Sequence, residues 1–234
     1  MEEEMATFLF CVGGHTGGWW VREKGIEARL RDAGHEVLRP TYTGVGERIH
    51  LSNPNIDLNT HIQDIVMVLK FEELEEIILV GHSYGGMIAA GVLEESPERI
   101  AHLVILDGII PEDGQSVADI VGPQVMQYLR ANAEEHGDGW QIIPDWPGAK
   151  PRHTGQPLAT METKITITNP LAVQIPKTYV FCTEGKEDLP LIKYTIDQIP
   201  RVKSDPNWDY YEINTDHDFT ETDELVNVLL DIGR

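Results

Sequence analysis

The chain has 234 residues, of which 41% are hydrophobic and 24% are charged, and this composition is typical of a globular protein. It excludes a disordered chain and a collagen-like repeat. No apolar run approaches the ~20 residues of a membrane-spanning helix. The acidic start of the chain lacks the basic region of a signal peptide, so we expect a cytoplasmic protein.

Charge narrows the range of partners. The chain has 18 Lys and Arg residues against 39 Asp and Glu residues, which gives a formal net charge of −21. Such a surface repels phosphate backbones and anionic lipids. We therefore expect neither a nucleic acid nor a membrane as partner, while assembly into a homo-oligomer stays open.

Short apolar runs and helical patterns alternate along the chain. Strands are predicted over 8–12, 35–38, 77–80, 102–106, 178–182 and 209–213, and helices over 20–33, 60–69, 84–95, 117–133 and 222–232. Gly34 is predicted to end the first helix, and Thr60 with Gln63 to form a capping box at the start of the second. The alternation predicts an α/β fold with a doubly wound, mostly parallel six-stranded sheet and flanking helices.

One long stretch breaks this alternation. Residues 111 to about 170 are rich in Pro, Gly and Trp, with one helical pattern near their start. An insertion of this length inside an α/β domain usually forms a cap over the sheet. We therefore predict a single domain over 1–234 with a small cap inserted at about 111–170.

The motif G-x-S-x-G at residues 81–85 follows the predicted strand 77–80 and precedes a helix. In this context it is typical of a nucleophile elbow, a sharp turn that exposes a serine hydroxyl at the carboxyl edge of the sheet. The turn also aims the next N–H and the helix N-terminus at the same point. We therefore predict Ser83 as the nucleophile and the Tyr84 amide as one donor of an oxyanion hole.

A serine nucleophile needs a base, and the chain has nine histidines. His217 follows the last predicted strand and precedes the last helix, so in a parallel sheet its loop emerges at the same edge as Ser83. A serine before a histidine is also the chain order expected for this architecture. The Gly-rich loop 13–19 follows the first strand, and we predict the N–H of His15 as the second oxyanion donor because glycines allow close backbone approach.

At these residues the chain resembles the α/β-hydrolase family, and most of all its compact branch of esterase-like and hydroxynitrile-lyase-like enzymes. The resemblance covers nearly the whole chain and includes the elbow and residues 17–19, 40–48 and 111–116. Where that branch usually has His-Gly after the first strand, this chain has Gly13-Gly14. The resemblance implies a sheet without the family's first two strands, with Ser83 and His217 in the catalytic roles.

The resemblance also places Cys11 and Cys182 on strands that two others separate. The gap is about three strand spacings of ~4.8 Å, which exceeds the ~7 Å limit for a disulfide. Neither cysteine belongs to a Cys/His cluster of the kind that binds zinc. We expect two buried thiols, no metal and no cofactor.

The family's usual place for the third triad member is the loop after the strand 178–182. Its aspartate position falls on Gly185 or Lys186, so the pattern departs there. Glu187 or Asp188 could take the role if this loop is one residue longer.

Asp107, directly after the strand 102–106, is the other candidate for the acid. Some α/β-hydrolases place their acid there, and an aspartate at the end of that strand would share the sheet edge with His217. The acid must accept the second imidazole N–H and stabilise the imidazolium. We predict Asp107, with Glu187 and Asp188 as the alternatives.

Together these roles predict a serine hydrolase of the carboxylesterase type that cleaves a small, largely apolar ester or lactone through an acyl-enzyme. Four large side chains of the insertion are predicted to line an apolar pocket: Met126, Tyr128, Trp140 and Trp146.

Two other functions fit these residues less well. In hydroxynitrile lyases of this fold a lysine follows the catalytic histidine and a threonine lies in the first loop, whereas Asp218 and Gly14 stand here. A negative charge would not stabilise departing cyanide. The other alternative, a non-catalytic small-molecule-binding homologue, is disfavoured by the intact Ser83 and His217.

Overall fold

The computed structural model describes residues 5–186 and 192–234. Six strands form one parallel sheet in the order β2-β1-β3-β4-β7-β8. Their bounds are β1 (Thr7–Cys11), β2 (Glu36–Leu38), β3 (Ile77–His82), β4 (Ile100–Leu106), β7 (Lys177–Cys182) and β8 (Trp208–Ile213). The doubly wound parallel sheet predicted from the alternating pattern is confirmed, because each of the six apolar runs forms one of these strands.

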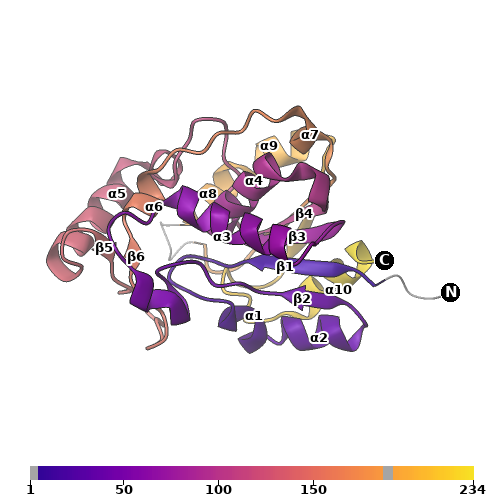
Figure 1. Cartoon of the computed structure of the whole chain (residues 1–234), viewed down its shortest axis with the longest axis horizontal. Helices are drawn as coiled ribbons and strands as arrows, with labels where there is room; N and C mark the ends of the chain where they lie inside the picture. Colours follow the sequence, from indigo (N-terminus) through magenta and orange to yellow (C-terminus); the bar gives the residue numbers. More distant parts are fainter. Residues whose placement is uncertain (1–4, 187–191) are drawn as a thin grey trace.

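Helices cover both faces of the sheet (Figure 1). One side carries α3 (Leu58–Phe71) and α4 (Gly85–Glu95), and the other carries α1 (Trp19–Glu23), α2 (Ile26–Asp32) and α10 (Asp223–Ile232). The shorter helices are α7 (Pro170–Gln174), α8 (Tyr194–Asp197) and α9 (Ile199–Ser204), with 3₁₀ turns at η1 (Gly46–Leu51) and η2 (Pro97–Arg99). The order of the strands reverses between β1 and β3, and ligands of such sheets bind beside that point at the carboxyl ends of the strands.

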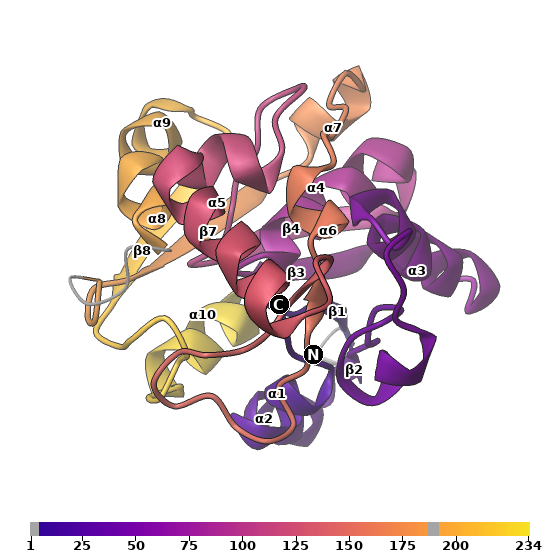
Figure 2. The same cartoon turned by 90° about the vertical axis from the view of Figure 1, so that its left-hand side faces the viewer.

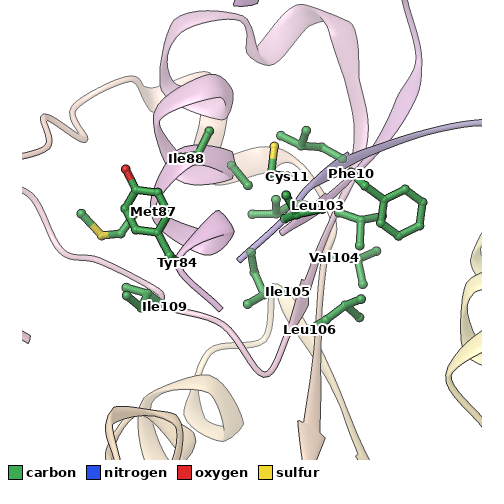
Figure 3. Close-up of a cluster of buried hydrophobic side chains, with 14 of the residues drawn as sticks. Phe10, Cys11, Tyr84, Met87, Ile88, Leu103, Val104, Ile105, Leu106 and Ile109 are labelled. Carbon is green, nitrogen blue, oxygen red and sulfur yellow. The ribbon is translucent and has the colours of Figure 1, made fainter. Parts of the chain in front are cut away.

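The core lies between the central strands and the helices on both faces of the sheet. Figure 3 shows part of it: Cys11 of β1 and Leu103 and Ile105 of β4 lie on the side of Met87 and Ile88 of α4, and Phe10, Val104 and Leu106 lie on the opposite side of the strands. All six residues of β3 are buried, as expected for a strand covered on both faces. Cys11 and Cys182 are free buried thiols, and β3 and β4 lie between their strands.

Three helix predictions need correction. Residues 20–33 form two helices, because Gly25 between them has a left-handed φ of 72°, a conformation that glycine adopts without cost. The capping box of α3 is made by Asp57 and Thr60, one turn before the predicted pair. The helix predicted over 117–133 is kinked at Gly122, where φ is 84°.

The inserted segment contains α5 (Val117–His136), α6 (Ala159–Glu162) and a small antiparallel pair, β5 (Gln141–Ile142) with β6 (Gln156–Pro157). It lies at the end of the sheet opposite the N-terminus, and Figure 2 shows α5 crossing in front of the strands. The segment therefore covers the edge at which the parallel strands end and the predicted catalytic residues emerge.

Candidate active site

The predicted nucleophile stands at a strained turn. Ser83 lies between the last residue of β3 and the first of α4, with a left-handed φ of 54°, which is costly for a residue with a Cβ. The turn is so tight that a Cβ at Gly85 would lie 2.0 Å from the carbonyl oxygen of Cys11. Strain of this kind, held by close packing, is characteristic of functional sites.

The structure brings the predicted base and acid to this serine. Nε2 of His217 lies 3.0 Å from Oγ of Ser83, and Nδ1 lies 2.5 Å from Oδ2 of Asp107. A carboxylate only accepts hydrogen bonds, so Nδ1 carries the proton and Nε2 is free to accept the serine proton. His217 follows Ser83 by 134 positions and Asp107 by 110 positions in the sequence, and the fold joins the three residues in one hydrogen-bonded series.

Asp107 is completely buried, and its carboxylate is fully engaged. Oδ1 accepts the N–H of Cys182 at 3.2 Å, while Oδ2 accepts from both His217 and the ammonium of Lys186. Burial by itself raises the pKa of Asp107, but the hydrogen bond and charge of His217, together with Lys186, outweigh it and hold the pKa below its usual value. The carboxylate therefore stays ionised beside the base.

Lys186 is a residue of this site that the sequence reasoning did not assign. It occupies one of the two positions on which the family's usual aspartate was expected to fall, and its side chain is only 6% exposed where it pairs with Asp107. The only signal for it was this departure from the family pattern. The alternative acids Glu187 and Asp188 lie outside the described residues, so the choice of Asp107 stays a prediction.

His82, the residue before the nucleophile, anchors the loop of the base. Its Nε2 lies 2.8 Å from the carbonyl oxygen of His217, and its ring stacks on Trp20 at 4.4 Å between centroids. Burial, reinforced by the neighbouring His217, lowers the pKa of His82 to about 3. The neutral His82 ring thus donates one hydrogen bond to the His217 backbone and fixes its position.

The two predicted oxyanion donors differ in the structure. The N–H of His15 donates to Oε1 of Gln156 at 2.8 Å, so the prediction of His15 is corrected: this donor already has a protein partner. Within residues 5–186 and 192–234, the N–H groups of Gly14 and Tyr84 have no hydrogen-bond partner. A Cβ at Gly14 would lie 3.7 Å from that of Tyr84, so the two residues are neighbours across the elbow.

The four predicted pocket residues separate into two groups. Tyr128 is 54% exposed and donates its hydroxyl proton to Asp145, so it faces solvent and the prediction that it lines an apolar pocket is wrong. Met126 is buried, and Trp140 and Trp146 are half-buried. The ring of Trp146 lies 5.2 Å from that of His15. For these three the pocket role stays a prediction.

Tyr194, on α8, is a further neighbour of the nucleophile that the sequence did not indicate. Its buried phenol has a pKa raised by burial, while the hydroxyl of Ser83 opposes the shift. Over the described residues, no cluster of three His, Cys, Asp or Glu side chains has the arrangement of a metal site. No helix there combines the length and the apolar character needed to cross a membrane.

The chain belongs to the alpha/beta hydrolase family, whose model matches residues 8–227. The resemblance seen in the sequence is thereby confirmed. Over 113 residues, 48% of this chain and 46% of the relative, it is 50% identical to a carbendazim hydrolyzing esterase of Nocardioides sp. (strain SG-4G). It is also 26% identical over 114 residues to polyneuridine aldehyde esterase of Rauvolfia serpentina, which is 47% of this chain and 41% of that protein. The chain matches less than half the length of these curated relatives.

Solved structures agree over nearly the whole chain. An extracellular alpha/beta-hydrolase from a Paenibacillus species superposes with a TM-score of 0.79 at 24% identity, covering 98% of this chain and 99% of the other. A pyrethroid hydrolase from Sphingobium faniae JZ-2 gives a TM-score of 0.73 at 18% identity, covering 98% and 97%. At these identities the likeness shows the fold, which is that of an α/β-hydrolase.

Proposed function

We propose that this chain is a serine hydrolase of the carboxylesterase type, which cleaves a small, largely apolar ester or lactone through an acyl-enzyme. The observation that carries the proposal is the hydrogen-bonded series of Ser83, His217 and Asp107. It gives the nucleophile a base within hydrogen-bonding distance and gives the base an orienting carboxylate. This is the arrangement that activates a serine for acyl transfer.

In the first half of the reaction Nε2 of His217 takes the proton of Ser83, and Oγ bonds to the carbonyl carbon of the ester. The carbonyl oxygen becomes an oxyanion, for which the unpartnered N–H groups of Gly14 and Tyr84 are our candidate donors. Asp107 stabilises the imidazolium. The C–O bond to the leaving group then breaks, and the imidazolium returns its proton to the departing alkoxide.

The second half repeats these steps with water. Nε2 of His217 takes a proton from water, and the hydroxide oxygen bonds to the acyl carbon. The bond to Oγ of Ser83 breaks, Oγ regains the proton, and the carboxylic acid leaves. Each proton taken by His217 is returned, so the cycle needs no cofactor.

The names of the relatives support an ester or a related acyl bond as the target. The matched proteins include a carbendazim hydrolyzing esterase and polyneuridine aldehyde esterase. Met126, Trp140 and Trp146 are the described candidates for apolar contact with the substrate. The net charge of −21 supports a small molecule over a nucleic acid as partner, and the cytoplasmic location and the single domain with its cap remain predictions.

Hydrolysis of p-nitrophenyl acetate, together with labelling by a fluorophosphonate, tests the function. The wild type should turn over the ester and carry the label on Ser83, and Ser83→Ala should lower the rate by about 10⁴-fold or more. Ser204→Ala is the matched control, because Ser204 is exposed and its hydroxyl donates to the carbonyl of Arg201. Label on another serine, or full activity in Ser83→Ala, would contradict the proposal.

A further inference from the structure

Three hydrogen bonds join the inserted segment to one residue of the Gly-rich loop, His15. The N–H of Thr154 donates to the carbonyl of His15 at 2.9 Å, and Nδ1 of His15 lies 3.0 Å from the carbonyl of Thr154. The N–H of His15 donates to Gln156 at 2.8 Å. His15 has a left-handed φ of 61°, so three hydrogen bonds hold a strained residue that directly follows Gly14.

Gln156 makes the contact with the backbone N–H, and its own side chain is fully buried. Its Oε1 accepts from His15, and its Nε2 donates to the hydroxyl of Thr160 at 2.8 Å. The Thr160 hydroxyl in turn donates to the carbonyl of Pro157 at 2.7 Å. A side-chain amide whose donor and acceptor are both engaged has one fixed orientation.

The same buried cluster reaches the other oxyanion residue. The hydroxyl of Tyr84 lies 3.0 Å from Nδ1 of His61, whose Nε2 lies 2.9 Å from the carbonyl of Thr43. Burial raises the pKa of Tyr84, and the hydroxyl of Thr160 opposes that rise. A Cβ at Gly14 would lie 2.6 Å from Oε1 of Gln156 and 3.7 Å from the Cβ of Tyr84, so the inserted segment reaches the point where the two sides of the candidate oxyanion hole meet.

We propose that Gln156 is a positioning residue for the oxyanion hole: by holding the His15 N–H it fixes the Gly14–His15 peptide, on one side of Gly14, while the hydroxyl of Thr16 holds the carbonyl of Gly13 in the adjoining peptide that carries the Gly14 N–H. The proposal rests on the proposed function, since it concerns the same site. The spacing is tight, because a Cβ at Gly14 would lie 2.6 Å from Oε1 of Gln156. Oxyanion donors act by being oriented before the reaction, so a loop free to rotate stabilises the transition state less.

The test compares two amides of the inserted segment. Gln156→Met keeps the length of the side chain and removes both polar atoms. Asn132→Leu is the matched control, because Asn132 is also buried and bonds the backbone N–H and carbonyl of Ile143 but no residue of the loop 13–18. Asn132 also donates to the carboxylate of Asp145 at 3.0 Å, so Asn132→Leu should lose at least as much unfolding free energy as Gln156→Met.

Kinetics with p-nitrophenyl acetate separate the two roles. Gln156→Met should lower kcat by about 10- to 100-fold with KM within about twofold, because the loss falls on the transition state. Asn132→Leu should keep both constants near wild type. Thr160→Ser, which retains the hydroxyl, should also stay near wild type, whereas Thr160→Val should lower kcat in the same direction as Gln156→Met.

Three outcomes would overturn the inference. Equal losses of kcat in Gln156→Met and Asn132→Leu would mean a general structural role. A raised KM with unchanged kcat would make Gln156 a substrate contact, and a raised kcat would mean that its oxygen obstructs the hole. A wild type without ester turnover or label would instead refute the proposed function, so the two failures are distinguishable.

Discussion

The two halves of the candidate site are held by different parts of the molecule. Ser83, Asp107 and His217 follow β3, β4 and β8 of one sheet, and their half is charged, with Asp107 buried between His217 and Lys186. The oxyanion half consists of two neutral backbone N–H groups, that of Tyr84 in the elbow and that of Gly14, which precedes the residue that Gln156 of the insertion holds. A buried charge needs partners fixed by the core, whereas a neutral donor contributes only through its direction. The following changes test this difference, starting with the largest expected effect.

Asp107→Asn removes the buried carboxylate at the centre of the charged half. An amide in place of the carboxylate favours the wrong tautomer of His217, so the rate of p-nitrophenyl acetate hydrolysis should fall by about 10⁴-fold with the fold intact by circular dichroism. Glu187→Ala and Asp188→Ala serve as controls and should change the rate of hydrolysis little. If one of those two abolishes turnover while Asp107→Asn stays near wild type, the acid lies in the loop after β7.

Lys186→Met removes one partner of the buried charge. Asp107 and Lys186 are 0% and 6% exposed, and breaking such a pair should lower the free energy of unfolding by about 3 kcal/mol. The matched control is Lys203→Met, because Lys203 and Glu212 are 50% and 52% exposed and exposed pairs contribute less than about 1 kcal/mol. Urea denaturation measures both, and equal losses would refute the special role of the buried pair.

The acid side of the pH–rate profile tests the base. A histidine base must be neutral to take the serine proton, so the protonated base is inactive. As the pH falls and the base becomes protonated, the rate should fall about tenfold per unit. His82 cannot cause this fall, because its pKa lies at about 3. A rate that stays flat down to clearly acidic pH in the folded protein would argue against His217.

The buried, neutral His61, which lies behind the oxyanion half of the site, should make the free energy of unfolding depend on pH. Burial lowers the pKa of His61, behind Tyr84, to about 4, against about 6.5 in the unfolded chain. The unfolded state therefore binds the proton first, so the contribution of His61 is complete above about pH 6.5 and is lost as the pH falls toward 4. Between pH 7.5 and 5 the wild type should lose about 2 kcal/mol more than His61→Gln.

Urea midpoints at the two pH values measure this difference. His50→Gln is the control, since His50 is exposed and its replacement should leave the pH dependence unchanged. A His61→Gln variant with the same pH dependence as the wild type would show that His61 is not buried in its neutral form.

The sequence by itself determined the strands, their parallel arrangement and the place of Ser83 and His217. These features are local, because a buried parallel strand is a short apolar run and a nucleophile elbow needs small residues two positions to either side of the serine. Gly25 shows the limit of such patterns, since the helical pattern continues through it while its left-handed φ divides the helix.

Tertiary structure decided which side chains contact the residues of the candidate site. Lys186 meets Asp107 across 79 positions, and Gln156 meets His15 across 141. No periodicity or spacing encodes such pairs, because they form only where the packing of the sheet and the insertion brings distant segments together. Tyr128 is solvent-exposed for the same reason: its helix has an apolar side and a polar side, and only packing fixed which of the two faces the sheet.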